Sequence, residues 1–127
     1  MPQSESCRAT LTFKDGDQTM TFAGRTQNQH GHAEMDALHD VIEHYVDDRK
    51  RLGRIKDSMD NWTEKLVSCP DKPVCRGCTH VLKSLGFTCK DDGTVFSDNA
   101  SKNWGVSLTV RAFLNECAID WESYRNC

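Results

Sequence analysis

The chain has 127 residues, 37% of them hydrophobic, and a formal net charge of −3, which fits one compact domain over residues 1–127. No stretch reaches a membrane-spanning length and the first residues lack a signal-peptide pattern, so we expect no membrane partner. The negative charge gives no overall footprint for nucleic acid and disfavours tight duplex binding, so only a local basic patch could contact phosphates.

The first elements are predicted to form a β-hairpin. Residues 7–14 and 19–23 alternate between polar and apolar side chains, as around Leu11 and Phe13. An Asp-Gly-Asp turn signal at 15–17 separates the two segments.

A polar loop at 24–31 follows, and a helical pattern begins at Ala33. One face of this predicted helix is apolar and contains Leu38, Val41, Ile42, Tyr45 and Val46. Gly53 is the expected end of the helix.

The second half of the chain continues the alternation of helices and strands. Residues 55–62 have helical spacing, a short strand is expected at 65–68, and a helix is expected from Cys75 to Gly86. Two short strands, at 87–90 and 94–97, then flank another Asp-Gly turn.

A final amphipathic helix is predicted from Val106 or Thr109 to about Tyr124, with Trp121 facing inward. Helices that alternate with strands favour an α/β fold in which helices cover both faces of a central sheet. The expected fold is therefore a three-layer α/β/α sandwich.

The cysteines indicate a metal site and reduced thiols. There are seven of them, an odd number that argues against complete disulfide pairing, and Cys69, Cys75 and Cys78 cluster. We therefore expect a reducing compartment at the place of action. Cys7, Cys89 and Cys117 fall on apolar faces and are predicted to be small core residues.

Two motifs suggest chemistry: His32-Ala33-Glu34 and Cys75-Arg76-Gly77-Cys78. His32, Cys75 and Cys78 can hold one zinc ion with its fourth position open, while Glu34 is suited to move protons. The two cysteines are three residues apart and so are neighbours on one helical turn. Both motifs lie where a helix begins, and the free N–H groups there favour the negative charge of a thiolate.

In order and type, these motifs resemble the signature of the cytidine deaminase-like superfamily, H-x-E followed by P-C-x-x-C, and the resemblance covers effectively the whole domain. One departure is that Val74 separates Pro73 from Cys75, which bears on the local loop more than on the ligands. The resemblance implies a central mixed sheet of about five strands. It also implies a Zn²⁺ cofactor and a hydrolase in which Glu34 is the catalytic acid and base.

Within this superfamily the chain looks most like the deaminase domains of bacterial polymorphic toxins. That resemblance implies deamination of cytosine to uracil in nucleic acid, with single-stranded DNA favoured because the base must be exposed. It further implies an immunity protein as partner, delivery into the cytoplasm of a target cell as part of a larger secreted toxin, and a monomer. Asn28 in the loop before His32 resembles in placement a residue that contacts the sugar in relatives.

Several alternatives remain open at this stage. The enzyme could act on free nucleosides or nucleotides, or on adenine in RNA, or the chain could be a zinc-stabilised binding module without turnover. In the last case a closed site is available, because Cys69, Cys75, Cys78 and His80 lie close in sequence.

Three other features are candidates for substrate binding. Trp104 lies in a loop and could stack on a base, whereas Trp62 and Trp121 are predicted to be core residues. His30 could contact substrate, and His39 and His44 are expected to be surface or core residues rather than ligands. The basic cluster is either a solvated helix end or a phosphate-binding patch and contains Arg49, Lys50, Arg51, Arg54 and Lys56.

Overall fold

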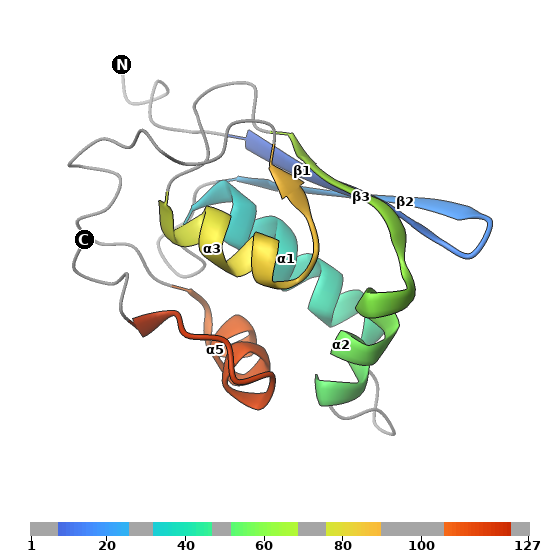
Figure 1. Cartoon of the computed structure of the whole chain (residues 1–127). Coiled ribbons are helices and arrows are strands. Elements are labelled where there is room, and N and C mark those ends of the chain that lie inside the picture. Colours follow the sequence, from blue (N-terminus) through green and yellow to red (C-terminus); the bar gives the residue numbers. More distant parts are fainter. Residues whose placement is uncertain (1–7, 26–31, 47–51, 69–75, 90–105, 123–127) are drawn as a thin grey trace, which may run out of the picture.

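A computed structural model of the chain describes residues 8–25, 32–46, 52–68, 76–89 and 106–122 (Figure 1). The strands are β1 (Arg8–Asp15), β2 (Gln18–Arg25), β3 (Thr63–Ser68) and β4 (Thr88–Cys89). The helices are α1 (Ala33–Tyr45), α2 (Leu52–Asn61), α3 (Arg76–Ser84) and α5 (Leu108–Glu116). The α/β class predicted from the sequence is confirmed.

The four strands form one open mixed sheet in the order β2-β1-β3-β4. β1 is antiparallel to both β2 and β3, whereas β3 and β4 are parallel. Parallel neighbours need a crossover connection, and α3 lies within the one that joins β3 to β4. The predicted fifth strand, at 94–97, lies outside the described residues.

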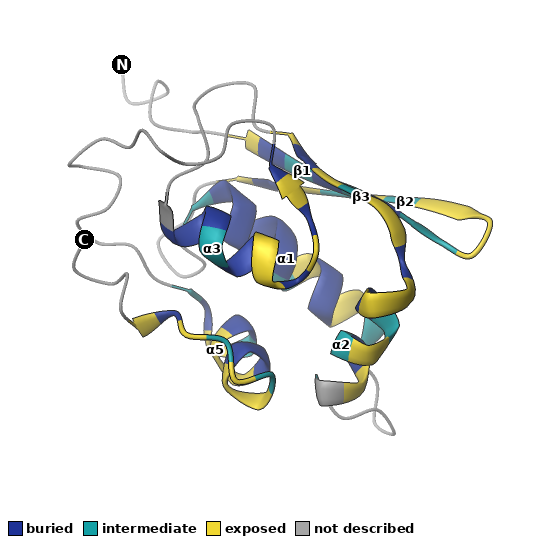
Figure 2. Ribbon diagram, in the orientation of Figure 1, coloured by how far each residue is buried: buried dark blue, intermediate teal, exposed yellow. Residues whose placement is uncertain are grey.

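The inner face of the sheet packs against the helices. Leu11 and Phe13 of β1 and Val67 of β3 are buried there, and α1 and α3 lie across this face (Figures 1 and 2). Phe13 stacks on Trp62 with ring centroids 3.9 Å apart. Trp62 and Trp121 are both buried, so their prediction as core residues is confirmed.

The outer face of the sheet is polar. It is formed by every second residue of β1, namely Arg8, Thr10, Thr12 and Lys14, and by their partners in β2, namely Arg25, Ala23, Thr21 and Thr19. Leu66 of β3 points to the same side and is 45% exposed. All the described helices lie on the inner side (Figure 1). A three-layer sandwich is therefore not confirmed, and the hydroxyl-rich outer face offers little apolar surface to hold a second helical layer.

Two helix ends differ from the prediction. α1 ends at Tyr45, because Val46 adopts an extended conformation while its N–H still bonds to Ile42 O, and Gly53 lies inside α2 instead of ending α1. α5 ends at Glu116 rather than near Tyr124. None of the helices in the described ranges is long and apolar enough to cross a membrane.

Polar contacts tie the helices to the sheet. The Tyr45 hydroxyl of α1 donates a hydrogen bond to Asp15 Oδ2 at 3.1 Å. Burial, together with this bond and the charge of Asp15, raises the pKa of Tyr45 to about 12. At the same end of the sheet, Lys65 Nζ donates to Met59 O at 2.8 Å and to Leu85 O at 3.0 Å, which joins α2 to the turn that follows α3.

Candidate metal centre

The candidate site lies where α1 and α3 begin, at one end of the sheet. Because β2 and β3 are both antiparallel to β1, which lies between them, they run in the same direction. Their carboxyl ends therefore lie at the same end of the sheet. The chain passes from β2 to α1 and from β3 to α3. The starts of the two helices are therefore brought together at the carboxyl ends of these strands, the usual place for ligand sites in α/β sheets.

His32 is the N-cap residue of α1, with extended dihedral angles of φ −66° and ψ 161°. Its carbonyl accepts the first helical hydrogen bond, from Asp36 N at 2.9 Å, and its ring is directed toward α3. Cys78 lies in the first turn of α3 and is buried. His32 Nδ1 and Cys78 Sγ are 3.6 Å apart.

This separation matches a shared zinc ion. Zinc bonds of about 2.3 Å to sulfur and about 2.0 Å to nitrogen, at a tetrahedral angle, place the two ligand atoms about 3.5 Å apart. The ligand atoms of His32, Glu34 and Cys78 all lie within 4.8 Å of one another. Imidazole and thiolate are the donors that zinc prefers, so the residues present fit this metal.

Glu34 is the acidic member of the group and is only 4% exposed. Its Oε1 lies 3.8 Å from Cys78 Sγ. A buried carboxylate and a thiolate at this distance would repel each other, and a cation held between them and His32 would offset the repulsion. The carboxylate is thus placed either to bind the metal directly or to exchange protons with a molecule bound to it.

Strand β2 fixes the position of this first turn of α1. A Cβ atom on Gly24 would overlap the backbone at Ala33 O and Ala37 N, so the strand and helix approach as closely as glycine allows. Asp36 is 5% exposed, and its Oδ2 accepts a hydrogen bond from Arg25 N at 2.8 Å. Neither residue was predicted from the sequence to position the site, although a glycine within a strand is a known sign of close backbone approach.

Cys89, the last residue of β4, reaches the same end of the sheet. Its thiol has a raised pKa, chiefly because the thiol is buried. The charge of Lys83 and a hydrogen bond with Thr79 oppose this shift, whereas the charge of Glu34 adds to it. Cys89 is 7% exposed and belongs to the hydrophobic core, as predicted. Among the described cysteines, Cys78, Cys89 and Cys117 are not joined in disulfide bonds.

Several predicted site residues lie outside the described ranges. Cys75 is one residue before the start of α3, and Asn28 and Trp104 fall in the 26–31 and 90–105 segments. His30 and Cys69 are also outside. Of the proposed metal ligands, the structure therefore brings together His32 and Cys78, with Glu34 beside them.

The remaining histidines do not belong to this group within the described residues. His39 Nδ1 lies 2.7 Å from Ser107 Oγ, the hydroxyl that caps α5, and so links α1 to α5. His44 is exposed and contacts the ring of Phe22. His80, the fourth member of the alternative closed zinc site, is in α3 but is not part of the group.

The predicted basic cluster is described only at Arg54 and Lys56. Arg54 is exposed, and Lys56 Nζ pairs with Asp60 Oδ1 at 2.7 Å within α2. This pair neutralises one of the cations and favours the interpretation as a solvated helix surface.

Comparison of the chain with protein-family models, with curated proteins and with solved structures found no match. The interpretation of the site therefore depends on the residues and geometry described above.

Proposed function

We propose that the protein is a zinc-dependent hydrolytic deaminase that converts cytosine to uracil in nucleic acid, with single-stranded DNA as the favoured substrate. The observation that carries the proposal is the 3.6 Å separation of His32 Nδ1 and Cys78 Sγ, with the buried Glu34 carboxylate beside them. An imidazole and a thiolate at a zinc-like distance, joined by a buried carboxylate, are the parts that the H-x-E and C-x-x-C chemistry requires.

In this proposal His32 and Cys78 hold the metal together with Cys75, which precedes α3 by one residue. Zinc, when bound, supplies a Lewis acid that lowers the pKa of water to about 7. Glu34 carries one proton of the attacking water to the N3 atom of cytosine and the other to the amino group, which leaves as ammonia. Burial of Glu34 keeps bulk water away from these proton transfers.

The wider parts of the proposal come from the family resemblance. They are a toxin domain delivered into a target cell, an immunity protein that blocks it, and a sheet of about five strands, for which the turn pattern predicts the fifth at residues 94–97. Such a strand would extend the sheet beyond β4, its edge strand, and would leave the outer face open.

Glu34→Gln tests the proposal because it keeps the size of the side chain and removes its proton chemistry. Loss of a general acid and base lowers a rate by about 10²–10⁴-fold. We expect this variant to retain its fold and bound zinc, and to lose uracil formation in a single-stranded oligonucleotide. Glu43→Gln is the matched control, since Glu43 is an exposed acid of the same helix.

The substrates are assayed in parallel: single-stranded DNA, duplex DNA, RNA and free cytidine. Zinc is measured by elemental analysis of each purified variant. A zinc-loaded parent protein without activity on any of them would contradict the proposal and favour the binding module. An unchanged rate in Glu34→Gln would rule out the role given to Glu34.

A further inference from the structure

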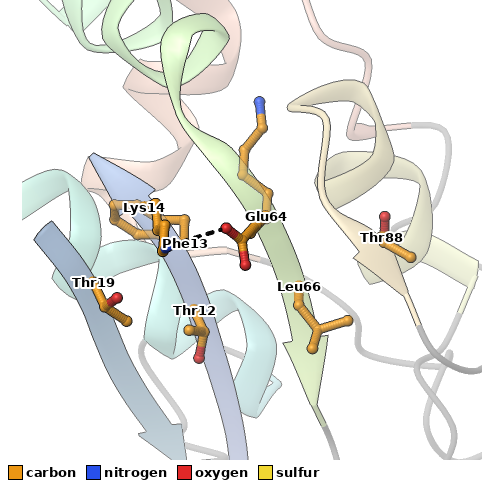
Figure 3. A pocket seen from close by; sticks show the side chains of 8 residues that line it. Thr12, Phe13, Lys14, Thr19, Glu64, Leu66 and Thr88 are labelled. Carbon is orange, nitrogen blue, oxygen red and sulfur yellow. Dashed lines mark ion pairs between the residues drawn. The ribbon is translucent and has the colours of Figure 1, made fainter. Parts of the chain in front are cut away.

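In the described part of the chain, the sheet has one long open edge. The strand order ends at β2 on one side and at the short β4 on the other. Figure 3 shows the outer face between these edges, where a shallow hollow of about 390 Å³ runs from Thr19 of β2 to Thr88 of β4. Its ion pair, Lys14 Nζ with Glu64 Oε2 at 3.3 Å, neutralises its own charges. The edge beside Thr19 is therefore a better candidate for an interaction surface than the hollow.

This edge of β2 presents backbone groups that β1 does not use. Arg25 N donates to Asp36 Oδ2 at 2.8 Å, so this N–H points away from β1 although Arg25 lies in register with that strand. In an antiparallel pair, the residues that bond to the partner strand alternate with residues that do not. The N–H and C=O groups of Thr19, Thr21 and Ala23 therefore also point away from β1, and all three residues are exposed.

The β2 strand lacks the features by which edge strands usually avoid further pairing. It is eight residues long and contains no proline. It keeps an unbroken register with β1, without a bulge. No charged side chain interrupts it between Gln18 and Gly24. A long, regular edge of this kind is a template for another strand.

The apolar side chains of β2 are incompletely covered by its own chain. Met20 and Phe22 face the helices and are only partly buried. Their cross-strand neighbours in β1, Phe13 and Leu11, are both 0% exposed. A further strand beside β2 would remove more of the Met20 and Phe22 surface from water, which favours association.

The apolar pattern of β2 is complementary to itself in the antiparallel direction. When Thr21 is placed opposite Thr21 of a second copy, Met20 lies opposite Phe22 and Thr19 lies opposite Ala23. Two-fold symmetry repeats each of the last two pairs. The partly buried apolar residues then meet on the inner side, and small polar or apolar residues meet on the outer side.

The charges at the ends of β2 fit the same register. Asp17, an exposed residue of the turn before β2, would lie opposite Arg25 of the second copy, and the symmetry creates this pair twice. Opposite charges placed across neighbouring strands are stabilising. A shift of one strand by two residues would separate Asp17 from Arg25, so the charges select this one register.

We propose that the protein forms a homodimer in which two copies of β2 pair antiparallel about a two-fold axis at Thr21. The pairing joins the two sheets into one and forms backbone hydrogen bonds at Thr21 and between Thr19 and Ala23. A second copy is the occupant because β2 itself supplies both members of every side-chain pair. This assembly differs from the monomer that the family resemblance implies, and it does not depend on the proposed deaminase function.

Sedimentation velocity of the whole chain over a range of concentrations tests the proposal. A reducing agent ensures that none of the seven cysteines links two chains. The parent protein is expected to change from monomer to dimer as its concentration rises. Asp17→Arg and Arg25→Glu should each raise the dissociation constant at least about tenfold, because each places like charges opposite one another at two symmetric positions.

An equimolar mixture of these two variants is the sharpest measurement. In a mixed pair, positions 17 and 25 again carry opposite charges at both ends of the interface. The mixture should therefore form a heterodimer at concentrations where each variant alone is monomeric. Asp57→Arg and Arg54→Glu are the matched controls, since they make the same charge changes at exposed residues of α2 and should dimerise like the parent.

Thr21→Pro tests the backbone pairing independently of charge. It removes an N–H at the centre of the proposed interface, and proline is tolerated in an edge strand where the N–H points away from the neighbouring strand. This variant should keep the far-ultraviolet circular dichroism of the parent and remain monomeric. It also keeps the proposal testable if Arg25→Glu does not fold.

A parent protein that stays monomeric up to its highest soluble concentration would overturn the proposal. A dimer that persists unchanged in Thr21→Pro and in Asp17→Arg would also overturn it, because the dimer would then use another surface. If the two charge variants associate no more tightly together than alone, the register centred on Thr21 is wrong.

Discussion

We expect replacement of Gly24 by alanine to weaken the fold and the candidate metal centre together. The new methyl group would overlap Ala33 O and Ala37 N, which belong to the backbone of α1. A side chain could rotate away, but a helix backbone can only move as a unit. Gly24→Ala should therefore push the start of α1, with His32 and Glu34, away from β2.

The magnitude follows from the kind of contact. Overpacking a core costs about 1–3 kcal/mol, and the upper end applies here because the atoms that are met are backbone. For a chain of this size, about 3 kcal/mol lowers the melting temperature by about 10 °C. Displacing a residue that orients metal ligands costs about 10–100-fold in metal affinity, and we expect zinc binding to weaken by that factor.

The assay combines urea unfolding of the metal-free protein with competition for zinc against a chelator. Gly16→Ala is the control: Gly16 has a φ of 65° but nothing lies near its Cβ position. It should cost about 1 kcal/mol through backbone strain and leave zinc affinity unchanged. If Gly24→Ala has parental stability and zinc affinity, the close contact between β2 and α1 does not position the site.

Two further predictions concern pH and the ligand set. In the folded protein Tyr45 should titrate near pH 12 rather than 10, so its contribution to stability is complete below pH 10 and is lost as the pH rises toward 12. Ultraviolet absorbance of the phenolate checks this, and Tyr45→Phe should remove the high-pH step; a step that persists in that variant would contradict the assignment. Cys69→Ser should keep its zinc whereas Cys78→Ser should lose it, as measured by elemental analysis, and loss of zinc from Cys69→Ser would favour the closed structural site.

The sequence predicted most of the elements because their signals are local. The hairpin of β1 and β2 follows from alternation around an Asp-Gly turn, and the observed start of α1 at Ala33 agrees with the prediction. The positions of β3 and α3 were also predicted to within a few residues. The spacing of apolar residues changes at the boundaries of each of these segments. Each segment can therefore be recognised without knowledge of contacts with distant residues.

The helix ends were not predictable in the same way. α1 stops because Val46 becomes extended, yet the charged residues that follow are equally compatible with a helix. After α5, Ala118 adopts a φ of 57°, a conformation usually given to glycine, and Ile119 N bonds back to Leu114 O. No glycine marks that end, so the apolar spacing predicted a helix that continues past Trp121. Trp121 is indeed buried, but it lies after the turn that follows α5.

The candidate metal site also contains some residues that can be predicted from local sequence and others that depend on contacts between distant segments. Residue types and spacing identified His32, Glu34 and Cys78, and the structure places them together. Gly24 and Asp36 were not predicted to position the site, because their roles depend on the packing of β2 against α1. A glycine near the end of a strand is a local sign of close approach, but it does not say which backbone comes near.

The order of strands decides whether the site exists at all. β3 lies beside β1, on the side opposite β2, and so β2 and β3 both end where α1 and α3 begin. If β3 had instead paired antiparallel with β2 in a simple meander, its carboxyl end would lie at the opposite end of the sheet. The two helix starts would then be separated by the length of an eight-residue strand, which is about 26 Å at about 3.3 Å per residue. His32 and Cys78 could share no ion across that distance, although every motif in the sequence would be unchanged.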